Sequence, residues 1–567
     1  MLKSLLIHND NTPLNIHPDI STSILFAPTL EELNNSDIDT YISKKILPQI
    51  KNEEFDIVFI RDTLSKNYID FYGLVLAYHI RLSTTTLKKE QNLTPIVILS
   101  DIDSYIINKI TSIGQILFKK NVFIAPNNKS TLDRFNNESF KPMLLTSDEY
   151  NFDFLDKINI KPPKDYLSHH SITNEWAIDQ WSQILGITEK TKTNHEKISF
   201  MLYYKYLQAK YELDSCNSRF IKQKSYNGKV LLIDDKWKAG WKEIISTFIE
   251  LHYTDVVCET VEKINKDSTF DEIESYVVEK IAVDNSPDVV LLDLRLLNNE
   301  NEVNKTTNDK SYINKLSGIK ILKVIKKLNP AIQIIAFTAS SDAMILDEVY
   351  NNGILGYVKK DSPTNIYLAP KNSFSKLNTL LKEGLKRKYL KNIYEIQENI
   401  LKLDFLKNAK LIIGEDNNDI SIKNTIPQVF DILDSNLSNP FLYAMYAIFK
   451  CIEYINDMYF REQRIEGKWK AIWKDSDKLE MIAGYSTEDR IKAIIEQKLQ
   501  IKSDQEWIFE AVHKIVCSRN YNIHGGEEKV NCKDGLIKLP TEKNIEEWFE
   551  MLYIILLHIN RFRKSIK

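Results

Sequence analysis

The stretch 229–235 reads KVLLIDD, a short apolar run that ends directly in two aspartates. Three similar stretches follow, DVVLLDLRL (288–296), IQIIAFTAS (332–340) and GYVKKDSP (356–363), with amphipathic segments between them. Short apolar runs that alternate with amphipathic segments are typical of βαβ units and a parallel sheet. Residues 228–375 are therefore predicted to form an α/β domain.

A second set of such stretches lies near the N-terminus. Its apolar runs are LLIHND (5–10), FDIVFIRD (55–62), TPIVILSD (94–101) and NVFIAP (121–126). Amphipathic segments again separate the runs, so another α/β domain is predicted over residues 1–130.

The two remaining parts of the chain have apolar residues at helical spacing. In residues 131–227 this spacing occurs in NEWAIDQWSQIL (174–185), and a helical connector is predicted there. Residues 376–567 contain aromatic-rich stripes such as NPFLYAMYAIFKCIEYI (439–455) and are predicted to be helical. The expected order is α/β, helical connector, α/β and C-terminal helical domain.

Composition limits the class of protein. A chain of 567 residues is too long for one hydrophobic core, and 43% hydrophobic and 27% charged residues exclude a mainly disordered or fibrous chain. The net charge of −3 gives no global basic field for nucleic acid. The longest apolar runs are too short for a membrane span, and the N-terminus lacks the pattern of a secretory signal. The five cysteines form no C-x-x-C pair, so neither a disulfide framework nor a zinc site is predicted, and a cytoplasmic location without membrane contact is expected.

Three carboxylates follow two strands of the second α/β domain. Asp234 and Asp235 come after VLLI, and Asp293 comes after DVVLL. The carboxyl ends of parallel strands share one edge of the sheet, where ligands bind in open α/β folds. Three acids that converge there repel one another unless a cation neutralises them, and oxygen ligands of this kind suit Mg²⁺.

Two further strand ends carry groups suited to a phosphoryl ligand. Thr338 ends IQIIAFT with a hydroxyl that can donate a hydrogen bond to a phosphoryl oxygen. Lys359 and Lys360 follow GYV, and either can pair with phosphate as a point charge. Polar residues on a solvated rim explain any one of these groups more simply, but not four successive strand ends in this order.

This set of residues resembles the receiver domain of two-component response regulators. The resemblance implies a flavodoxin-like fold in which Asp293 is the phosphoacceptor. By the same resemblance, Asp234, Asp235, Asp293 and the backbone carbonyl of Arg295 hold Mg²⁺, Thr338 and Lys360 bind the phosphoryl group, and Tyr357 is a switch residue. A histidine kinase or a small phosphodonor is the implied partner. The Asn/Lys-rich insert 298–317 departs from the family pattern.

The N-terminal α/β domain resembles a receiver that has lost this chemistry. Alignment of the two domains places Arg61 opposite Asp293, Gly73 opposite Gly318 and Ser100 opposite Thr338. The acid pair becomes His8-Asn9-Asp10, and the lysine position falls at Ala125. A guanidinium cannot accept a phosphoryl group, so a docking or dimerisation role is favoured over an active one.

The C-terminal helical domain contains a further candidate site. In DQEWIFEAVHKIVCSRNYNIHGG (504–526), the apolar stripe extends to Arg519 and Asn520, and His524 lies one turn further on. An arginine to hold phosphate, an amide to orient it and a histidine to move protons are sufficient for metal-free RNA cleavage. A plain helix end with a solvated Arg and His is the alternative explanation.

The stretch R-N-Y-N-I-H resembles the Arg-x4-6-His motif of HEPN domains, which are all-helical. The resemblance implies a homodimer in which Arg519, Asn520 and His524 of two chains line one cleft and cleave RNA without a cofactor. Some HEPN domains bind nucleotides or partners without cleaving. The sequence thus favours a phosphorylation-controlled response regulator with a HEPN endoribonuclease in stress or antiphage defence. The alternative is a non-catalytic regulator whose helical domain binds a partner protein or nucleotide.

Overall fold

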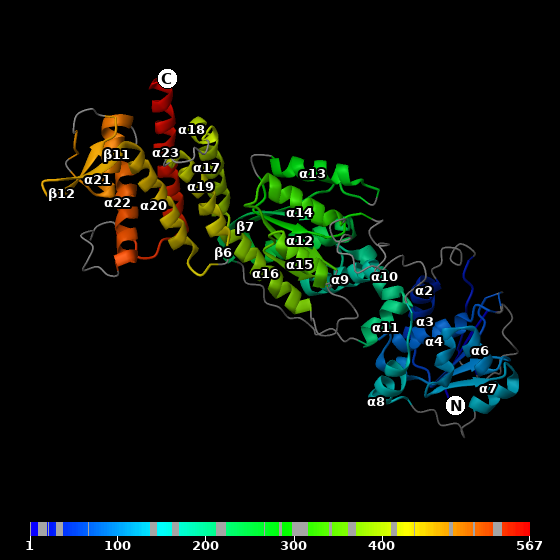
Figure 1. The fold of residues 1–567 in the computed structure, drawn as a ribbon. Coiled ribbons are helices and arrows are strands. Elements are labelled where there is room, and N and C mark those ends of the chain that lie inside the picture. Colours follow the sequence, from blue (N-terminus) through cyan, green and yellow to red (C-terminus); the bar gives the residue numbers. More distant parts are fainter. Residues whose placement is uncertain are drawn as a thin grey trace.

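The structure of the chain is a computed structural model, and it has three lobes in a row (Figure 1). The N-terminal sheet lies at one end, the second sheet lies in the middle, and the C-terminal helices lie at the other end. The structure describes residues 2–9, 20, 22–29, 38–65, 67, 69–84, 86–136, 144–161, 169–210, 223–265, 267–282, 286–297, 316–339, 343–360, 370–409, 417–435, 437–475, 480–482, 484–502, 505–524 and 536–566.

The N-terminal sheet is parallel and has the strand order β2-β1-β3-β4-β5. Its strands are β1 (Ser4–His8), β2 (Thr22–Leu25), β3 (Ile57–Arg61), β4 (Ile96–Leu99) and β5 (Val122–Ala125). Its helical segments are α2 (Ile38–Tyr41), η1 (Ile42–Ile46), α3 (Leu47–Lys51), α4 (Tyr72–Leu82), α5 (Lys89–Leu93), α6 (Ser104–Ile110), η2 (Ser112–Phe118) and α7 (Lys129–Asn136). This strand order is the flavodoxin-like one.

The second sheet repeats this topology, with the order β10-β9-β8-β6-β7 and only parallel pairs. Its strands are β6 (Gln223–Ile233), β7 (Tyr253–Thr260), β8 (Val289–Leu292), β9 (Gln333–Thr338) and β10 (Gly356–Lys359). Its helices are η5 (Trp237–Ala239), α12 (Trp241–His252), α13 (Phe270–Ala282), α14 (Ser317–Leu328), α15 (Ala343–Asn351) and α16 (Pro370–Lys386). The prediction of two parallel α/β sheets is therefore confirmed.

The connector belongs to the cores of both α/β domains. Its segments are α8 (Ser147–Glu149), η3 (Tyr150–Phe154), η4 (Leu155–Lys157), α9 (His169–Leu185), α10 (Lys192–Phe200) and α11 (Leu202–Lys210). Trp176 and Tyr204 pack in the core of the first domain. Trp181, five residues beyond Trp176 on the same helix, packs in the core of the second domain. Helix α9 therefore joins the two domains rather than separating them.

The C-terminal part forms one core that is mainly helical. Its elements are α17 (Tyr389–Leu401), α18 (Asp404–Lys407), α19 (Asn418–Asp434), α20 (Pro440–Tyr459), β11 (Phe460–Ile465), β12 (Lys468–Trp473), α21 (Thr487–Ala493), η8 (Ile494–Leu499), α22 (Gln505–His524) and α23 (Glu542–Ile566). The expectation of an all-helical domain is wrong at the antiparallel hairpin β11–β12. Glu466 and Gly467 both have positive φ, 51° and 78°, as a tight two-residue hairpin turn requires.

Contacts between the second sheet and the C-terminal domain lie at the amino ends of the strands. Lys391 of α17 donates hydrogen bonds to the Ser286 carbonyl at 2.8 Å and to Asp288 Oδ1 at 2.7 Å, just before β8. Ala331, just before β9, packs in the C-terminal core. The C-terminal domain therefore sits at the sheet edge opposite the predicted acidic site. None of the helices within the described residues has the length and apolar content needed to cross a membrane.

Candidate functional site

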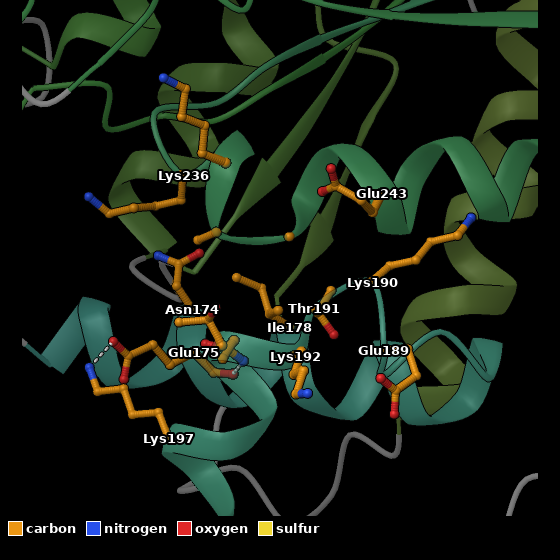
Figure 2. Close-up of a pocket in the computed structure, with 15 residues that line it drawn as sticks. Asn174, Glu175, Ile178, Glu189, Lys190, Thr191, Lys192, Lys197, Lys236 and Glu243 are labelled. Atoms are coloured by element: carbon orange, nitrogen blue, oxygen red, sulfur yellow. Dashed lines mark hydrogen bonds and ion pairs between the residues drawn. The ribbon is translucent and has the colours of Figure 1, made fainter.

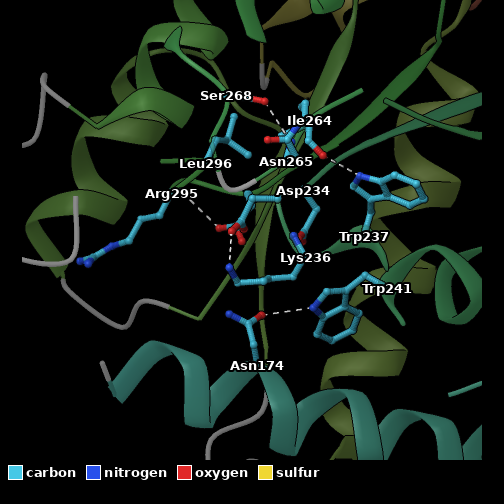
Figure 3. A network of polar contacts seen from close by, with 12 residues as sticks. Asn174, Asp234, Lys236, Trp237, Trp241, Ile264, Asn265, Ser268, Arg295 and Leu296 are labelled. Carbon is cyan, nitrogen blue, oxygen red and sulfur yellow. Dashed lines mark hydrogen bonds and ion pairs between the residues drawn. The ribbon is translucent and has the colours of Figure 1, made fainter. Parts of the chain in front are cut away.

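The three predicted carboxylates meet at the carboxyl edge of the second sheet. Ile233 of β6 is paired with Leu292 of β8, so the residues that follow these strands emerge side by side. Asp234, Asp235 and Asp293 each offer a carboxylate oxygen, and these oxygens lie within 4.8 Å of one another. Asp234 and Asp293 are both buried. Figure 3 shows Asp234 within the network of polar contacts at this edge.

Lys360 is the lysine that reaches these carboxylates. Its Nζ lies 2.8 Å from Asp234 Oδ2 and 2.6 Å from Asp293 Oδ2, and the side chain is fully buried. The ammonium also lies over the rings of Trp241 and Phe337, at 5.1 and 5.2 Å from their centroids. Of the two candidates from the sequence, Lys360 rather than Lys359 makes this contact.

The electrostatics of the cluster are those of crowded, desolvated acids. Burial raises the pKa of Asp234, Asp235 and Asp293, and the attraction of Lys360 opposes that rise. Burial by itself lowers the pKa of Lys360, but the two aspartates outweigh it and the pKa lies above its ordinary value. Lys236 adds a second cation, with its Nζ 2.6 Å from Asp235 Oδ2. Three acids thus face two lysines.

The donor set fits a hard divalent cation. Carboxylate oxygens within 4.8 Å of one another can occupy neighbouring positions around one Mg²⁺, which takes oxygen ligands at about 2.0–2.1 Å. Asp234, Asp235 and Asp293 are the side chains that would hold it. The backbone N–H of Arg295 donates to Asp293 Oδ1 at 3.3 Å, so the backbone of Arg295 lies close to this carboxylate. The use of its carbonyl as a ligand stays a prediction.

Thr338 and Tyr357 lie on the two strands beyond β8. Thr338 ends β9, is buried and accepts a hydrogen bond through its carbonyl from the Lys360 N–H at 2.7 Å. Tyr357 of β10 is half-buried, and the Lys376 ammonium of α16 lies 3.6 Å from its ring centroid. Because β9 pairs with β8, Thr338 lies at the same edge of the sheet as the acidic cluster. Most of the insert 298–317 falls outside the described residues.

A glycine sets the approach of α14 to the cluster, and its counterpart recurs in the N-terminal domain. A Cβ on Gly318 would lie 2.3 Å from the carbonyl oxygen of Asp293, and one on Gly73 would lie 1.9 Å from that of Arg61. Both positions exclude a side chain. The two close approaches support the alignment of Arg61 with Asp293.

The N-terminal counterpart of the cluster has Arg61 at the position that corresponds to Asp293. Arg61 Nη1 donates to Asn9 Oδ1 at 3.0 Å, where the second domain has an aspartate pair. Ser100 Oγ donates to Asp62 Oδ2 at 2.5 Å. Within the described residues, the only group of acids placed to hold a metal is the one in the second domain.

One residue of the N-terminal alignment needs correction. Ala125 pairs with Leu99 on β4, one residue before Ser100, whereas Lys359 pairs with Thr338 itself. If Ser100 corresponds to Thr338, the counterpart of Lys360 is Asn127 rather than Ala125. The neutral amide of Asn127 thus stands at the position of the buried Lys360. The alignment from sequence differs from this register by two residues because β5 of the N-terminal domain ends at Ala125.

In the C-terminal domain, α22 carries Arg519 and Asn520 near its end. Arg519 Nη1 donates to Asn520 Oδ1 at 3.0 Å, and the guanidinium lies 4.8 Å from the ring centroid of Phe449 on α20. Both side chains are half-buried. His524 is the last residue of α22, and its side chain falls outside the described part of the chain. The structure thus brings together two of the three predicted residues.

Cys517, two residues before Arg519, is disulfide-bonded. Cys258 and Cys451, the two other cysteines that the structure describes, are free. One disulfide-bonded cysteine is not a disulfide framework, so the absence of such a framework stays a prediction. Scattered spacing in the sequence carries no signal for such a pair.

Four residues on or near the acidic cluster were not predicted from the sequence. Lys236 pairs with Asp235, Trp241 covers Lys360, and Trp181 of the connector lies 5.6 Å from Trp241 and 5.7 Å from Phe337 between ring centroids. Asn174 Oδ1 accepts a hydrogen bond from Trp241 Nε1 at 3.2 Å. The periodicity of apolar residues predicts whether these side chains are buried or exposed, but it does not predict that α9 packs beside the acidic cluster.

Comparison with known proteins gives a family match for the first domain. Residues 10–125 match the family model of the inactive receiver domain. No curated protein matches the chain. A CheY-like response regulator receiver domain protein from Methanospirillum hungatei is 16% identical, with a TM-score of 0.19, and the match covers 28% of this chain and 98% of that one. A LuxR-family DNA-binding response regulator from Staphylococcus aureus is 16% identical, with a TM-score of 0.18, covering 27% and 98%. The family match supports a receiver-type domain in residues 10–125.

Proposed function

We propose that the protein is a response regulator whose second α/β domain is phosphorylated on Asp293. We further propose that its C-terminal domain is a metal-independent endoribonuclease of the HEPN type. The observation that carries the first part is the buried constellation of three aspartates and Lys360 at the carboxyl edge of the sheet.

The chemistry of the first step follows from this geometry. A carboxylate oxygen of Asp293 attacks the phosphorus of a phosphohistidine or an acyl phosphate, and the bond from phosphorus to the donor nitrogen or oxygen breaks. The new acyl phosphate takes the charge of Asp293, so the Lys360 ammonium can pair with a phosphoryl oxygen. The Thr338 hydroxyl can donate to another. Mg²⁺, when bound, neutralises the remaining negative charge.

Phosphorylation can be transmitted along two routes of packed side chains. Phe337 precedes Thr338 and packs against Trp181 of α9, so movement at Thr338 or Lys360 reaches the connector. Tyr357 packs under Lys376 of α16, and α16 leads directly into α17 of the C-terminal domain. The C-terminal domain contacts the edge of the sheet opposite the acidic cluster. The route through Tyr357 and α16 is therefore the one that connects the acidic cluster with the C-terminal domain. Phosphate shifts the domain only if it binds the two states with different free energies.

An RNA substrate is supported by Arg519, Asn520 and the hairpin β11–β12. The hairpin carries four cationic side chains, Arg461, Arg464, Lys468 and Lys470, with two carboxylates, Glu462 and Glu466. Trp469 is 55% exposed and lies opposite Arg464 in the register. An exposed indole among cations is suited to stacking on a base beside the phosphate backbone.

In the proposed cleavage, the RNA 2′-oxygen attacks the adjacent phosphorus and the bond to the 5′-oxygen breaks. This leaves a 2′,3′-cyclic phosphate and a free 5′-hydroxyl. Arg519 stabilises the charge that develops on phosphorus, Asn520 fixes the guanidinium, and His524 moves the proton. Pairing of two chains through the C-terminal domain, so that both contribute to one cleft, is part of the proposal.

The test is an RNA cleavage assay on wild type, His524→Ala and Arg519→Ala, with and without acetyl phosphate and Mg²⁺. Glu510→Ala, at an exposed pair on the same helix, is the matched control. We expect wild type and the control to produce 2′,3′-cyclic ends and the other two variants to be inactive. If no protein cleaves in any condition, the ribonuclease proposal fails and a binding role for the helical domain takes its place.

A further inference from the structure

A cavity of about 700 Å³ lies between the connector and the second α/β domain (Figure 2). One wall is α9 and the start of α10, and the other is the loop from Lys236 to the first turn of α12. A volume of this size is within the range of small-molecule sites. The acidic cluster is its neighbour, since Lys236 lines the cavity and also pairs with Asp235.

The cavity has an excess of positive charge. Five lysines from both walls line it, namely Lys190, Lys192, Lys197, Lys236 and Lys238, together with Glu175, Glu189 and Glu243. Glu175 is already engaged, because Lys197 Nζ lies 2.6 Å from it and the Tyr204 hydroxyl donates to it at 2.7 Å. Figure 2 shows the labelled lysines distributed around the rim rather than gathered on one wall.

Two helices begin at this cavity. Lys192 is the first residue of α10 and Trp241 that of α12, and neither helix has a side chain that caps its N–H groups. Gly240 has φ +138°, and a Cβ there would lie 2.9 Å from both Ile178 and Thr191. The glycine thus lets the start of α12 approach the connector. Partial positive charge from both helix starts adds to that of the lysines.

We propose that this cavity binds a phosphorylated small molecule of nucleotide size. Lys190 and Lys238, one from each wall, are the cations least committed elsewhere among those that line it. Lys190 makes one long hydrogen bond, 3.5 Å to Thr247, and Lys238 lies over the Trp237 ring. Both can turn toward a phosphate without breaking an ion pair within the described part of the structure.

Occupancy of the cavity is coupled to the acidic cluster through Lys236. A phosphate that draws the Lys236 ammonium toward the cavity releases Asp235 from its ion pair and frees a carboxylate for Mg²⁺. The ligand therefore raises the affinity of the cluster for Mg²⁺. This coupling rests on the proposed receiver function, whereas binding in the cavity does not.

Binding is tested by calorimetry on the full chain with AMP and pyrophosphate as probes and adenosine as the uncharged control. EDTA is present, so that the cluster holds no Mg²⁺. The cavity variant is Lys190→Gln/Lys238→Gln. The matched control is Lys242→Gln/Lys263→Gln, which removes the same charge from surface pairs with Glu262 and Glu279. Circular dichroism verifies that each variant folds.

Wild type and control are expected to bind AMP and pyrophosphate but not adenosine. The cavity variant is expected to bind AMP and pyrophosphate at least about tenfold more weakly than wild type. Binding of neither probe by wild type, or equal binding by the cavity variant, overturns the proposal.

Coupling is then measured by Mg²⁺ titration, with tryptophan fluorescence as the readout, in the presence and absence of AMP. Trp237 and Trp241 lie next to the acid pair and serve as reporters. AMP is expected to raise Mg²⁺ affinity in wild type but not in Lys236→Gln. If AMP binds and Mg²⁺ affinity is unchanged, the coupling is refuted while the cavity site stands. If Mg²⁺ does not bind at all, it is the proposed receiver function that fails.

Discussion

Replacing Lys360 with methionine removes the only cation that contacts both Asp234 and Asp293 within the described residues. The two contacts are 2.8 and 2.6 Å long, and the lysine and Asp234 are fully buried. Breaking a buried ion pair by removing one partner costs about 3–5 kcal/mol, because an uncompensated charge is left inside. Methionine keeps most of the volume between Trp241 and Phe337, so the cost is mainly electrostatic.

The free energy of unfolding of the second domain is measured by urea titration, with tryptophan fluorescence as the signal. With a slope of about 2 kcal/mol per M, the expected loss lowers the midpoint by about 1.5–2.5 M. The control Lys263→Gln removes a lysine from an exposed pair with Glu279 and is expected to leave the midpoint unchanged.

The pH dependence of the variant tests the cause. Burial raises the pKa of Asp234 and Asp293 above the usual 3.8, and loss of Lys360 removes a contribution that lowers it. Between pH 3.8 and the raised pKa values, these carboxyl groups are therefore protonated in the folded variant but ionised in the unfolded chain. Stability gained in this way is present at low pH and lost as pH rises, so the deficit relative to wild type shrinks as pH falls below 7. At pH 7, Mg²⁺ is expected to reduce the stability deficit of the variant relative to wild type. A variant that unfolds like wild type and responds to neither pH nor Mg²⁺ would refute the reasoning.

Three further changes have defined outcomes. Lys236→Gln frees Asp235 from its ion pair and is expected to raise Mg²⁺ affinity severalfold by fluorescence titration, and a fall in affinity would contradict this. Trp469→Ala, at the exposed tip of the hairpin, is expected to weaken binding of single-stranded RNA by about 1–3 kcal/mol in a gel-shift assay, and unchanged binding would remove the hairpin from the substrate path. Trp181→Ala leaves a cavity where α9 meets Phe337 and is expected to destabilise the second domain by about 3–5 kcal/mol in urea, whereas a shift confined to the first domain would show that α9 is not part of this core.

The acidic site could be predicted because its residues are tied to strand ends. In a parallel sheet all carboxyl ends share one edge, so four apolar runs with polar termini are enough to bring Asp234, Asp293 and Thr338 together. The choice of Lys360 over Lys359 needed the family resemblance, because both follow the same run. Geometry then shows which of the two is buried among the acids.

Features that depend on tertiary packing could not be predicted from the sequence. The hairpin β11–β12 turns at Glu466-Gly467, which is a weaker turn signal than Asn-Gly, and its flanking residues continue an aromatic pattern that suits a helix. Trp176 and Trp181 share one amphipathic helix yet serve different cores, and periodicity does not specify which partner a face will meet. The offset between Ala125 and Asn127 arose because strand ends shift by one or two residues.

The most direct test of the central claim is a phosphate-affinity gel of wild type, Asp293→Ala and Asp255→Ala after treatment with acetyl phosphate. Asp255 is an exposed aspartate on β7, away from the cluster, and serves as the matched control. We predict a shifted band for wild type and Asp255→Ala that requires Mg²⁺ and is absent from Asp293→Ala. If none of the three proteins shifts, or if Asp293→Ala shifts like wild type, Asp293 is not the phosphoacceptor.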